Sequence, residues 1–108
     1  MKRGDIVTVS APGDYGKPRP AVVVQSDALI AADSVLVALF TSAIAATPLY
    51  RRTIEQSTTN GLKAVSQVMV DKIVAYKRVK CGPAIGRLSG PEMLVLNNML
   101  SVMIGLAD

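Results

Sequence analysis

The feature that most constrains this chain is a succession of short β-rich runs separated by turn residues. Runs of β-branched and aliphatic residues of this length predict strands, and short turns between them favour antiparallel pairing. We expect strands at Gly4–Ser10, Arg19–Gln25, Ser34–Ser42, Tyr50–Glu55, Leu62–Val70 and Ile73–Arg78, a helical turn around Ala28–Ala31, and a short edge strand or turn at Ala84–Leu88.

The final segment changes to a helical period. Ser89 and Glu92 have the spacing of a capping box, in which the hydroxyl and the carboxylate each bond the other residue's backbone N–H. Apolar residues then recur on one helical face, at Leu96, Met99, Leu100 and Met103. We predict a helix over Pro91–Ile104 and, for the chain, a mainly β (α+β) fold: a strongly bent antiparallel sheet or small barrel of five to seven strands, with this helix capping one opening.

Length and hydropathy predict a single domain over residues 1–108. Half of the residues are hydrophobic but only 4% are aromatic, so the core should be aliphatic. The apolar runs are shorter than the roughly 18–20 residues that a membrane span needs, and the start lacks the apolar stretch of a signal peptide. We therefore expect a cytoplasmic protein with no membrane partner.

The scarcity of cysteine and histidine excludes several chemistries. One cysteine and no histidine rule out Ser-His-Asp triads, Cys-His pairs and zinc hydrolase sites, and no nucleotide-binding P-loop motif is present. An enzyme of this composition must use Arg, Lys, Asp, Glu, Thr, Ser or Tyr, and we expect no metal and no cofactor. The net charge of +4 favours an anionic partner such as nucleic acid or an acidic protein.

The loop Tyr15–Pro20 fixes one arginine at the start of a strand. Pro18 and Pro20 flank Arg19, and proline restricts both its own backbone and that of the residue before it. Arg19 should therefore be held extended at the mouth of the second strand. Two interpretations stay open here: a deliberately placed functional charge, or a Pro-Arg-Pro turn that only ends a loop.

Several blocks in register resemble the MazF/PemK (Kid) family of toxins from toxin–antitoxin modules. The blocks are Lys2–Val7, Gly16–Val23, Leu39–Ser42, Ser66–Val68 followed by Val70–Lys72, and Gly86–Ser89 with the helix after it. Together they span nearly the whole chain in the expected order. The resemblance implies an SH3-like barrel, a homodimer and a growth-inhibiting, sequence-specific, metal-independent endoribonuclease that cleaves single-stranded RNA (mRNA).

The same resemblance assigns the chemistry. It implies that Arg19 and Thr41 are catalytic, and that the ribose 2′-hydroxyl is the nucleophile, leaving 2′,3′-cyclic phosphate and 5′-hydroxyl ends. The guanidinium of Arg19 suits a phosphorane because its planar fork matches phosphate oxygens. A toxin also implies a cognate antitoxin, which we expect to contribute an acidic, partly disordered segment.

Four further residues near these two are candidates for substrate binding. Tyr15 and Lys17 precede Arg19, where they would stack on a base and contact a phosphate, or lie in a solvated loop. Ser42 follows Thr41, and strand alternation predicts that only one of the two enters the site. Gln67 would orient the substrate or hydrogen-bond a loop backbone.

Arg51 and Arg52 form a basic pair that strand alternation should direct to opposite faces. They would supply nonspecific phosphate contacts to RNA, or form part of a solvated surface.

Two other functions remain as alternatives to the nuclease. One is a non-catalytic, CcdB-like poison of DNA gyrase on the same fold, which would need neither Arg19 nor Thr41. The other is an interaction barrel that binds an acidic peptide.

Overall fold

Six strands form one antiparallel sheet in a computed structural model that describes residues 1–10, 17–106 and 108. The strands are β1 (Asp5–Ser10), β2 (Pro18–Val23), β3 (Ser34–Thr41), β4 (Arg51–Ile54), β5 (Ser66–Lys77) and β6 (Gly86–Arg87). Their order across the sheet is β4-β5-β3-β2-β1-β6. The 3-10 turns η1 (Asp27–Leu29) and η2 (Arg78–Lys80) lie in connections, and helix α1 (Gly90–Met103) follows the last strand.

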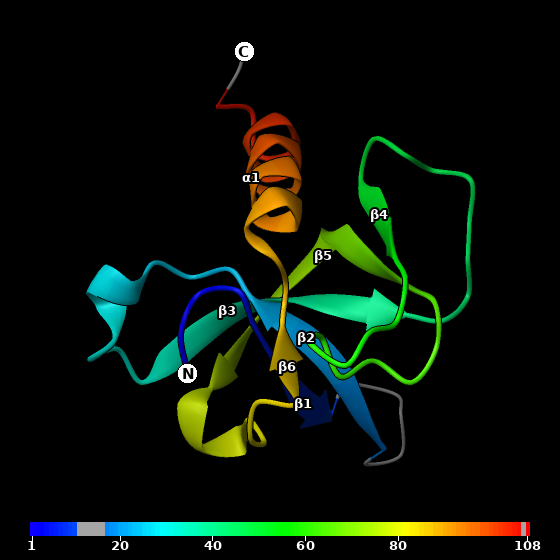
Figure 1. Cartoon of the computed structure of the whole chain (residues 1–108). Coiled ribbons are helices and arrows are strands. Elements are labelled where there is room, and N and C mark those ends of the chain that lie inside the picture. The colour runs from blue at the N-terminus through cyan, green and yellow to red at the C-terminus, as the bar shows by residue number, and fades with distance from the viewer. Residues whose placement is uncertain (11–16, 107) are drawn as a thin grey trace.

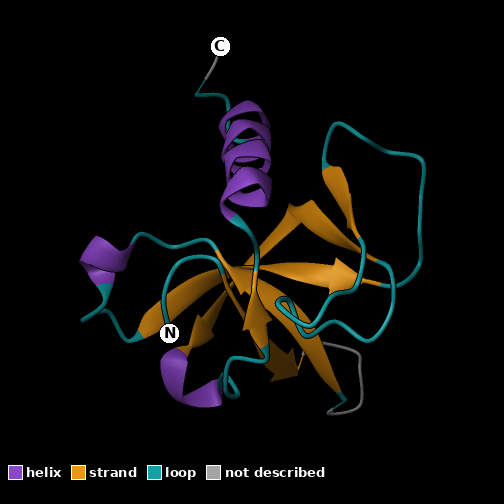
Figure 2. Cartoon of the chain, viewed as in Figure 1, coloured by secondary structure: helices purple, strands orange, loops and turns teal. Residues whose placement is uncertain are grey.

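The sheet curls into a half-barrel with α1 on one side (Figures 1 and 2). The predicted mainly β fold, with five to seven strands in a strongly bent antiparallel sheet and a C-terminal helix, is confirmed. The helical turn predicted near Ala28 is also present, as η1.

The prediction of two strands at Leu62–Val70 and Ile73–Arg78 is wrong. β5 runs without interruption from Ser66 to Lys77, through the polar pair Asp71 and Lys72. The pairing of β3 with β5 changes register between Ala38 and Phe40. Asp71 and Lys72 lie in the part of β5 that accommodates this shift, and both are exposed. An irregularity of this kind bends a strand without ending it, which explains why the polar pair does not form a turn.

Strand alternation divides the core into two layers. The layer nearer α1 contains Ile6, Val22, Ala38, Phe40, Ile54, Leu62, Val68, Val70, Leu88 and Leu96. The layer on the other face of the sheet contains Val7, Val9, Ala21, Val23, Val35, Val37, Leu39 and Met69. Neighbours along β1 and β2 fall into different layers, so the predicted burial of the Ala21–Val24 run on both faces is confirmed for its first three residues.

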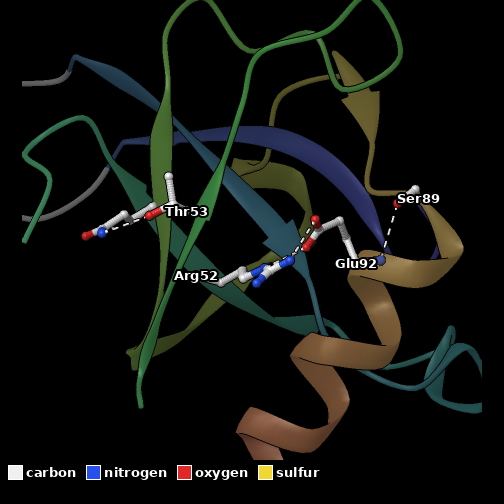
Figure 3. A network of polar contacts seen from close by, with 5 residues as sticks. Arg52, Thr53, Ser89 and Glu92 are labelled. Carbon is white, nitrogen blue, oxygen red and sulfur yellow. Dashed lines mark hydrogen bonds and ion pairs between the residues drawn. The ribbon is translucent and has the colours of Figure 1, made fainter. Parts of the chain in front are cut away.

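The start of α1 forms only half of the predicted capping box. Ser89 Oγ accepts a hydrogen bond from the Glu92 backbone N–H at 3.3 Å. The Glu92 carboxylate instead accepts two hydrogen bonds from Arg52, at 2.9 Å from Nε and 3.2 Å from Nη2 (Figure 3). A bidentate, charge-assisted pair is stronger than a single bond to a backbone N–H, so Glu92 links the helix to β4.

The predicted apolar stripe of α1 is correct except at its C-terminal end. Leu96 is buried, and Met99 and Leu100 pack partly against the first layer of the core. Met103 was expected to belong to the core but is exposed, because the last turns of α1 extend away from the sheet (Figure 1). Other large apolar residues near this end are exposed as well, at Val102, Ile104 and Leu106.

A buried asparagine and two glycines fix the loop between β4 and β5. Asn60 Oδ1 accepts from the backbone N–H groups of Ser57 and Leu62, and its Nδ2 donates to the Glu55 carbonyl. Gly61 has a positive φ of 69°, and a Cβ there would collide with the Ile85 carbonyl oxygen. A Cβ on Gly86 would likewise collide with the Asn60 backbone, so the loop packs backbone against backbone on the segment that enters β6.

We predict that Gly61→Ala destabilises the fold, whereas Gly90→Ala does not. The first change forces an L-residue into the left-handed region, at a cost of about 1–2 kcal/mol, and adds a backbone collision. A Cβ on Gly90, at the start of α1, meets no atom within 4 Å. Urea denaturation should give a clearly lower free energy of unfolding for Gly61→Ala and a value within about 0.5 kcal/mol of wild type for Gly90→Ala. Equal stabilities for the two variants would contradict this account of the loop.

Candidate functional site

Arg19 is the second residue of β2, as the flanking prolines predict. In the pairing of β1 with β2, Arg19 is opposite Val9, and Pro18 and Pro20 are opposite Ser10 and Thr8. The expectation that Arg19 is held extended at the mouth of a strand is confirmed. Arg19 is exposed at the surface.

The antiparallel pairing of β2 with β3 brings the start of one strand beside the end of the other. Ala21 pairs with Leu39, so continuing the same register by two residues places Arg19 opposite Thr41. Arg19 and Thr41 both line a pocket of about 660 Å³, together with Lys17 and Ser42. The remaining described lining residues are Thr8, Pro18, Pro20, Phe40, Gly61, Leu62, Lys63, Ala64, Ser66 and Ile85.

Thr41 and Ser42 both reach this pocket, which contradicts the prediction that only one would. Strand alternation applies as far as Thr41, the last residue of β3, but Ser42 already belongs to the following bend. Thr41 Oγ1 accepts a hydrogen bond of 3.1 Å from the Ala43 backbone N–H, which stabilises this bend. The Thr41 hydroxyl still has its own proton to donate, because the bond uses only a lone pair.

The pocket is equipped to bind an anion. Its described lining supplies the cations Lys17, Arg19 and Lys63 and the hydroxyl groups of threonine and serine, and it includes no carboxylate, histidine or cysteine. Over the described ranges 1–10, 17–106 and 108, no group of three or more His, Cys, Asp or Glu side chains is placed to hold a metal ion. Guanidinium, ammonium and hydroxyl donors together match the oxygens of a phosphate.

Cys81 is unsuited to act as a nucleophile. The thiol is half-buried beside η2 and is not among the lining residues of the pocket that contains Arg19. Burial raises the pKa of Cys81 by more than the nearby Arg78 lowers it. Little reactive thiolate is therefore present near neutral pH.

Gln67 lies in a different place from Arg19. It is 3% exposed and lines a second pocket, of about 630 Å³, between the loop after β3, β4 and α1. Its Oε1 accepts from the Ala45 N–H at 3.1 Å, while Nε2 donates to the Ala45 carbonyl at 2.8 Å and to Thr53 Oγ1 at 3.1 Å. Of the two roles considered for Gln67, these bonds correspond to holding a loop backbone.

Arg51 and Arg52 line the same second pocket as Gln67. Arg51 forms an ion pair with Asp71 at 3.5 Å, while Arg52 pairs with Glu92, which raises the pKa of Arg52 through the hydrogen bond and the carboxylate charge. Their ion-pair partners differ, but both residues line one pocket, so the prediction that they point to opposite faces stays a prediction. RNA contacts by Arg51, Arg52 and Gln67 stay predictions, because the structure does not place these residues beside Arg19.

Tyr15, the remaining candidate, lies outside the described residues. Conversely, the pocket contains residues that the sequence did not single out, notably Thr8, Lys63 and Ser66. Lys63 was assigned to a strand over Leu62–Val70, but β5 begins only at Ser66. Its position beside Arg19 arises from the loop fixed by Asn60, and no local pattern in the sequence encodes that proximity.

No helix in the described part of the chain is long and apolar enough to cross a membrane.

Comparison with solved structures identifies the fold. An endoribonuclease in complex with its cognate antitoxin from a mycobacterial species matches with a TM-score of 0.80 and 18% identity, covering 98% of this chain and 96% of that chain. The Mycobacterium tuberculosis toxin MazF-mt6 matches with a TM-score of 0.79 and 19% identity, covering 94% and 96%. MazF in a MazE–MazF structure from Deinococcus radiodurans matches with a TM-score of 0.74 and 17% identity, covering 97% and 95%. At these identities the matches establish the fold, as the resemblance to the toxin family implied.

Sequence comparison establishes the family. Residues 2–104 match the family model described as PemK-like, MazF-like toxin of type II toxin-antitoxin system. The chain is also 40% identical, over 108 residues and 99% of both sequences, to a protein of Mycolicibacterium smegmatis described as a probable endoribonuclease MazF. The chain therefore belongs to the PemK-like, MazF-like family of type II toxin–antitoxin toxins.

Proposed function

We propose that this protein is the endoribonuclease toxin of a toxin–antitoxin module, and that it cleaves single-stranded RNA with Arg19 and Thr41. The observation that carries the proposal is their convergence on one cationic pocket, in a chain 40% identical to a probable endoribonuclease MazF. The natural substrate is cytoplasmic mRNA, cleaved at particular sequences, and its cleavage inhibits growth.

The substrate supplies the nucleophile in this mechanism. The ribose 2′-oxygen attacks the adjacent phosphorus as its proton leaves, and the bond from phosphorus to the 5′-oxygen breaks as that oxygen gains a proton. The products are a 2′,3′-cyclic phosphate and a 5′-hydroxyl. Since a ribose hydroxyl attacks, the protein needs no activated serine or cysteine.

Arg19 stabilises the charge that grows on the phosphorane oxygens, and Thr41 donates one further hydrogen bond. A preorganised donor at developing charge contributes roughly 3–4 kcal/mol to lowering the barrier. Arg19 acts by stabilising charge, because a guanidinium offers hydrogen-bond donors and no acceptor. Neither residue requires a metal for this role.

The other candidate substrate contacts differ in whether they line the pocket that contains Arg19. Lys17 and Ser42 line the pocket and would bind phosphate oxygens on either side of the scissile bond. Tyr15, two residues before Lys17, would stack on a base. Arg51 and Arg52 would first have to exchange their ion pairs with Asp71 and Glu92 for contacts to RNA. Gln67 would orient the substrate through the loop that it holds.

A gyrase poison on the same fold is the other candidate function, and the family match does not favour it. It would use the barrel surface for binding, and neither the guanidinium of Arg19 nor the hydroxyl of Thr41 would be needed. The cleavage experiment below separates the two functions.

We predict cleavage of mixed-sequence RNA in the presence of EDTA, and loss of cleavage in Arg19 and Thr41 variants. Arg19→Ala and Thr41→Val should each lower kcat by about 10²–10³, because each removes a donor to the developing charge. Arg19→Lys should recover little of the rate, since a lysine lacks the planar fork. Sequencing of the 5′-hydroxyl ends would identify the cleavage motif.

Lys80→Ala is the matched control for these variants, because it removes one exposed positive charge from η2. It should cleave at the wild-type rate, and all variants should retain the wild-type melting temperature. RNA of every sequence left uncut, with growth arrest intact, would overturn the nuclease and favour the gyrase poison.

We also propose a homodimer formed partly through the exposed C-terminal end of α1. The described apolar residues there, Val102, Ile104 and Leu106, are between 59% and 74% exposed, and exposed apolar residues that gather in one place mark an interface. Ile104→Glu should raise the dimer dissociation constant by about two orders of magnitude or more, since burying an unpaired carboxylate costs several kcal/mol. Light scattering after gel filtration measures the change.

Leu29→Glu is the control for this dimer experiment, because Leu29 is a similarly exposed residue of η1, and the variant should stay dimeric. A wild-type protein that is monomeric at every concentration would refute the dimer.

We predict that the cognate antitoxin binds with a strong dependence on salt. An acidic, partly disordered segment would be attracted by the net charge of +4, and this attraction is screened as ionic strength rises. The affinity, measured by calorimetry at several KCl concentrations, should fall by at least about tenfold between about 50 and 300 mM, over which the Debye length shortens from about 14 to about 6 Å. Poly-glutamate serves as a control for nonspecific attraction. Affinity that does not change with salt would contradict the electrostatic account.

A further inference from the structure

Lys63 lines the same pocket as Arg19 from the segment between β4 and β5. That segment contributes Gly61–Ala64 and Ser66 to the lining, and Lys63, its one cation among these residues, is exposed. Lys17 and Arg19 approach from the start of β2, so the described cations enter the pocket from two segments that are far apart in the sequence. Nothing in the proposed cleavage chemistry uses Lys63.

The backbone on both sides of Lys63 is held in place. Leu62 is 7% exposed, and its N–H donates to Asn60 Oδ1 at 3.0 Å. On the other side, Ser66 is 7% exposed, and its Oγ donates to the Ala64 carbonyl at 3.0 Å. The backbone of Lys63 is therefore held on both sides, and only its side chain can change position relative to Arg19.

The pocket is large enough for a nucleotide and not only for a single phosphate. Its volume of about 660 Å³ lies within the roughly 300–1,000 Å³ range of ligand sites. Apolar side chains of Pro20, Leu62 and Ile85 contribute to the lining, where they offer contact to a ribose or a base. An RNA strand carries one phosphate per nucleotide, so cations that line one pocket from separate segments suit successive phosphates.

We propose that Lys63 is a substrate-binding residue that contacts a phosphate next to the scissile one. The inference rests on the proposed nuclease function, and it places the RNA strand between the start of β2 and the loop before β5. A lysine suits this role because its compact charge binds phosphate without demanding one geometry. The contact is the same before and during cleavage, so it contributes to binding and not to the chemical step.

The test uses Lys63→Gln, which keeps most of the side-chain length and removes the charge, and Lys63→Arg, which keeps the charge. Lys72→Gln is the matched control, because Lys72 is also exposed but lies on β5 outside the described lining of the pocket. The probe for binding is a 2′-O-methyl RNA oligonucleotide, which lacks the attacking hydroxyl and stays intact. Its Kd is measured at several KCl concentrations, and kcat and KM are measured separately with cleavable RNA.

Lys63→Gln should flatten the dependence of log Kd on log[KCl] by about 0.7, the value for one phosphate contact in single-stranded nucleic acid. It should raise KM roughly tenfold while kcat stays within about twofold, as expected when a binding contact to a charged group is lost. Lys63→Arg and Lys72→Gln should both retain the wild-type slope. Melting temperatures check that Lys63→Gln folds, as its exposed position predicts.

Two failures are distinguishable. If wild type cleaves RNA but Lys63→Gln has the slope and KM of Lys72→Gln, the role of Lys63 is overturned and the nuclease stands. If wild type cuts no RNA yet Lys63→Gln flattens the salt dependence, the nuclease is overturned and the phosphate contact at Lys63 stands.

Discussion

The pairing of β3 with β2 on one side and with β5 on the other positions Arg19, Thr41 and Ser66 in the candidate site. The register Ala21 to Leu39 brings Arg19 to the level of Thr41, and the pairing of Thr41 with Gln67 sets Ser66 beside the same pocket. A slip by one residue would exchange the two layers of the core, because side chains alternate between the faces. The nearly complete burial of Val22, Ala38 and Val68 therefore protects the geometry of a site that is itself exposed.

The site combines residues with different structural demands. Arg19 and Thr41 belong to strands in the centre of the sheet, whereas Lys63 belongs to a loop that depends on Asn60 and on the close backbone approach at Gly61. The described lining concentrates positive charge without a carboxylate, an arrangement that is unfavourable in isolation and favourable when an anion binds. The surrounding hydrogen bonds keep the backbone in place before an anion arrives, so binding need not order the pocket.

Much of this arrangement could be predicted from local sequence. The β-rich runs located β1 to β4, although they divided β5 into two strands. The prolines around Arg19 predicted its extended backbone, and the change to a helical period located α1. Contacts between distant segments could not be predicted. Glu92 prefers Arg52 to its capping partner because a bidentate ion pair is available only in the folded chain, and β5 absorbs its polar pair because β3 pairs with it on both sides of an irregularity. Lys63 could not be identified for the same reason, since Arg19, with which it shares the pocket, is 44 positions away in sequence (63 minus 19).

The two hydrogen bonds between the Gln67 side chain and the Ala45 backbone affect how the sequence of the connection after β3 can vary. Its carboxamide makes one donor and one acceptor bond to a single residue, as a neighbouring strand would, so one side chain substitutes for a missing strand. The connection between Thr41 and β4 is thus tethered at one point near its start, and the rest of it has no such tether to Gln67. Insertions or replacements beyond Ala45 can reshape the second pocket, which this connection lines, while the tether and the sheet stay as they are. The fold thereby separates the sheet that positions Arg19 and Thr41 from a connection whose sequence can vary.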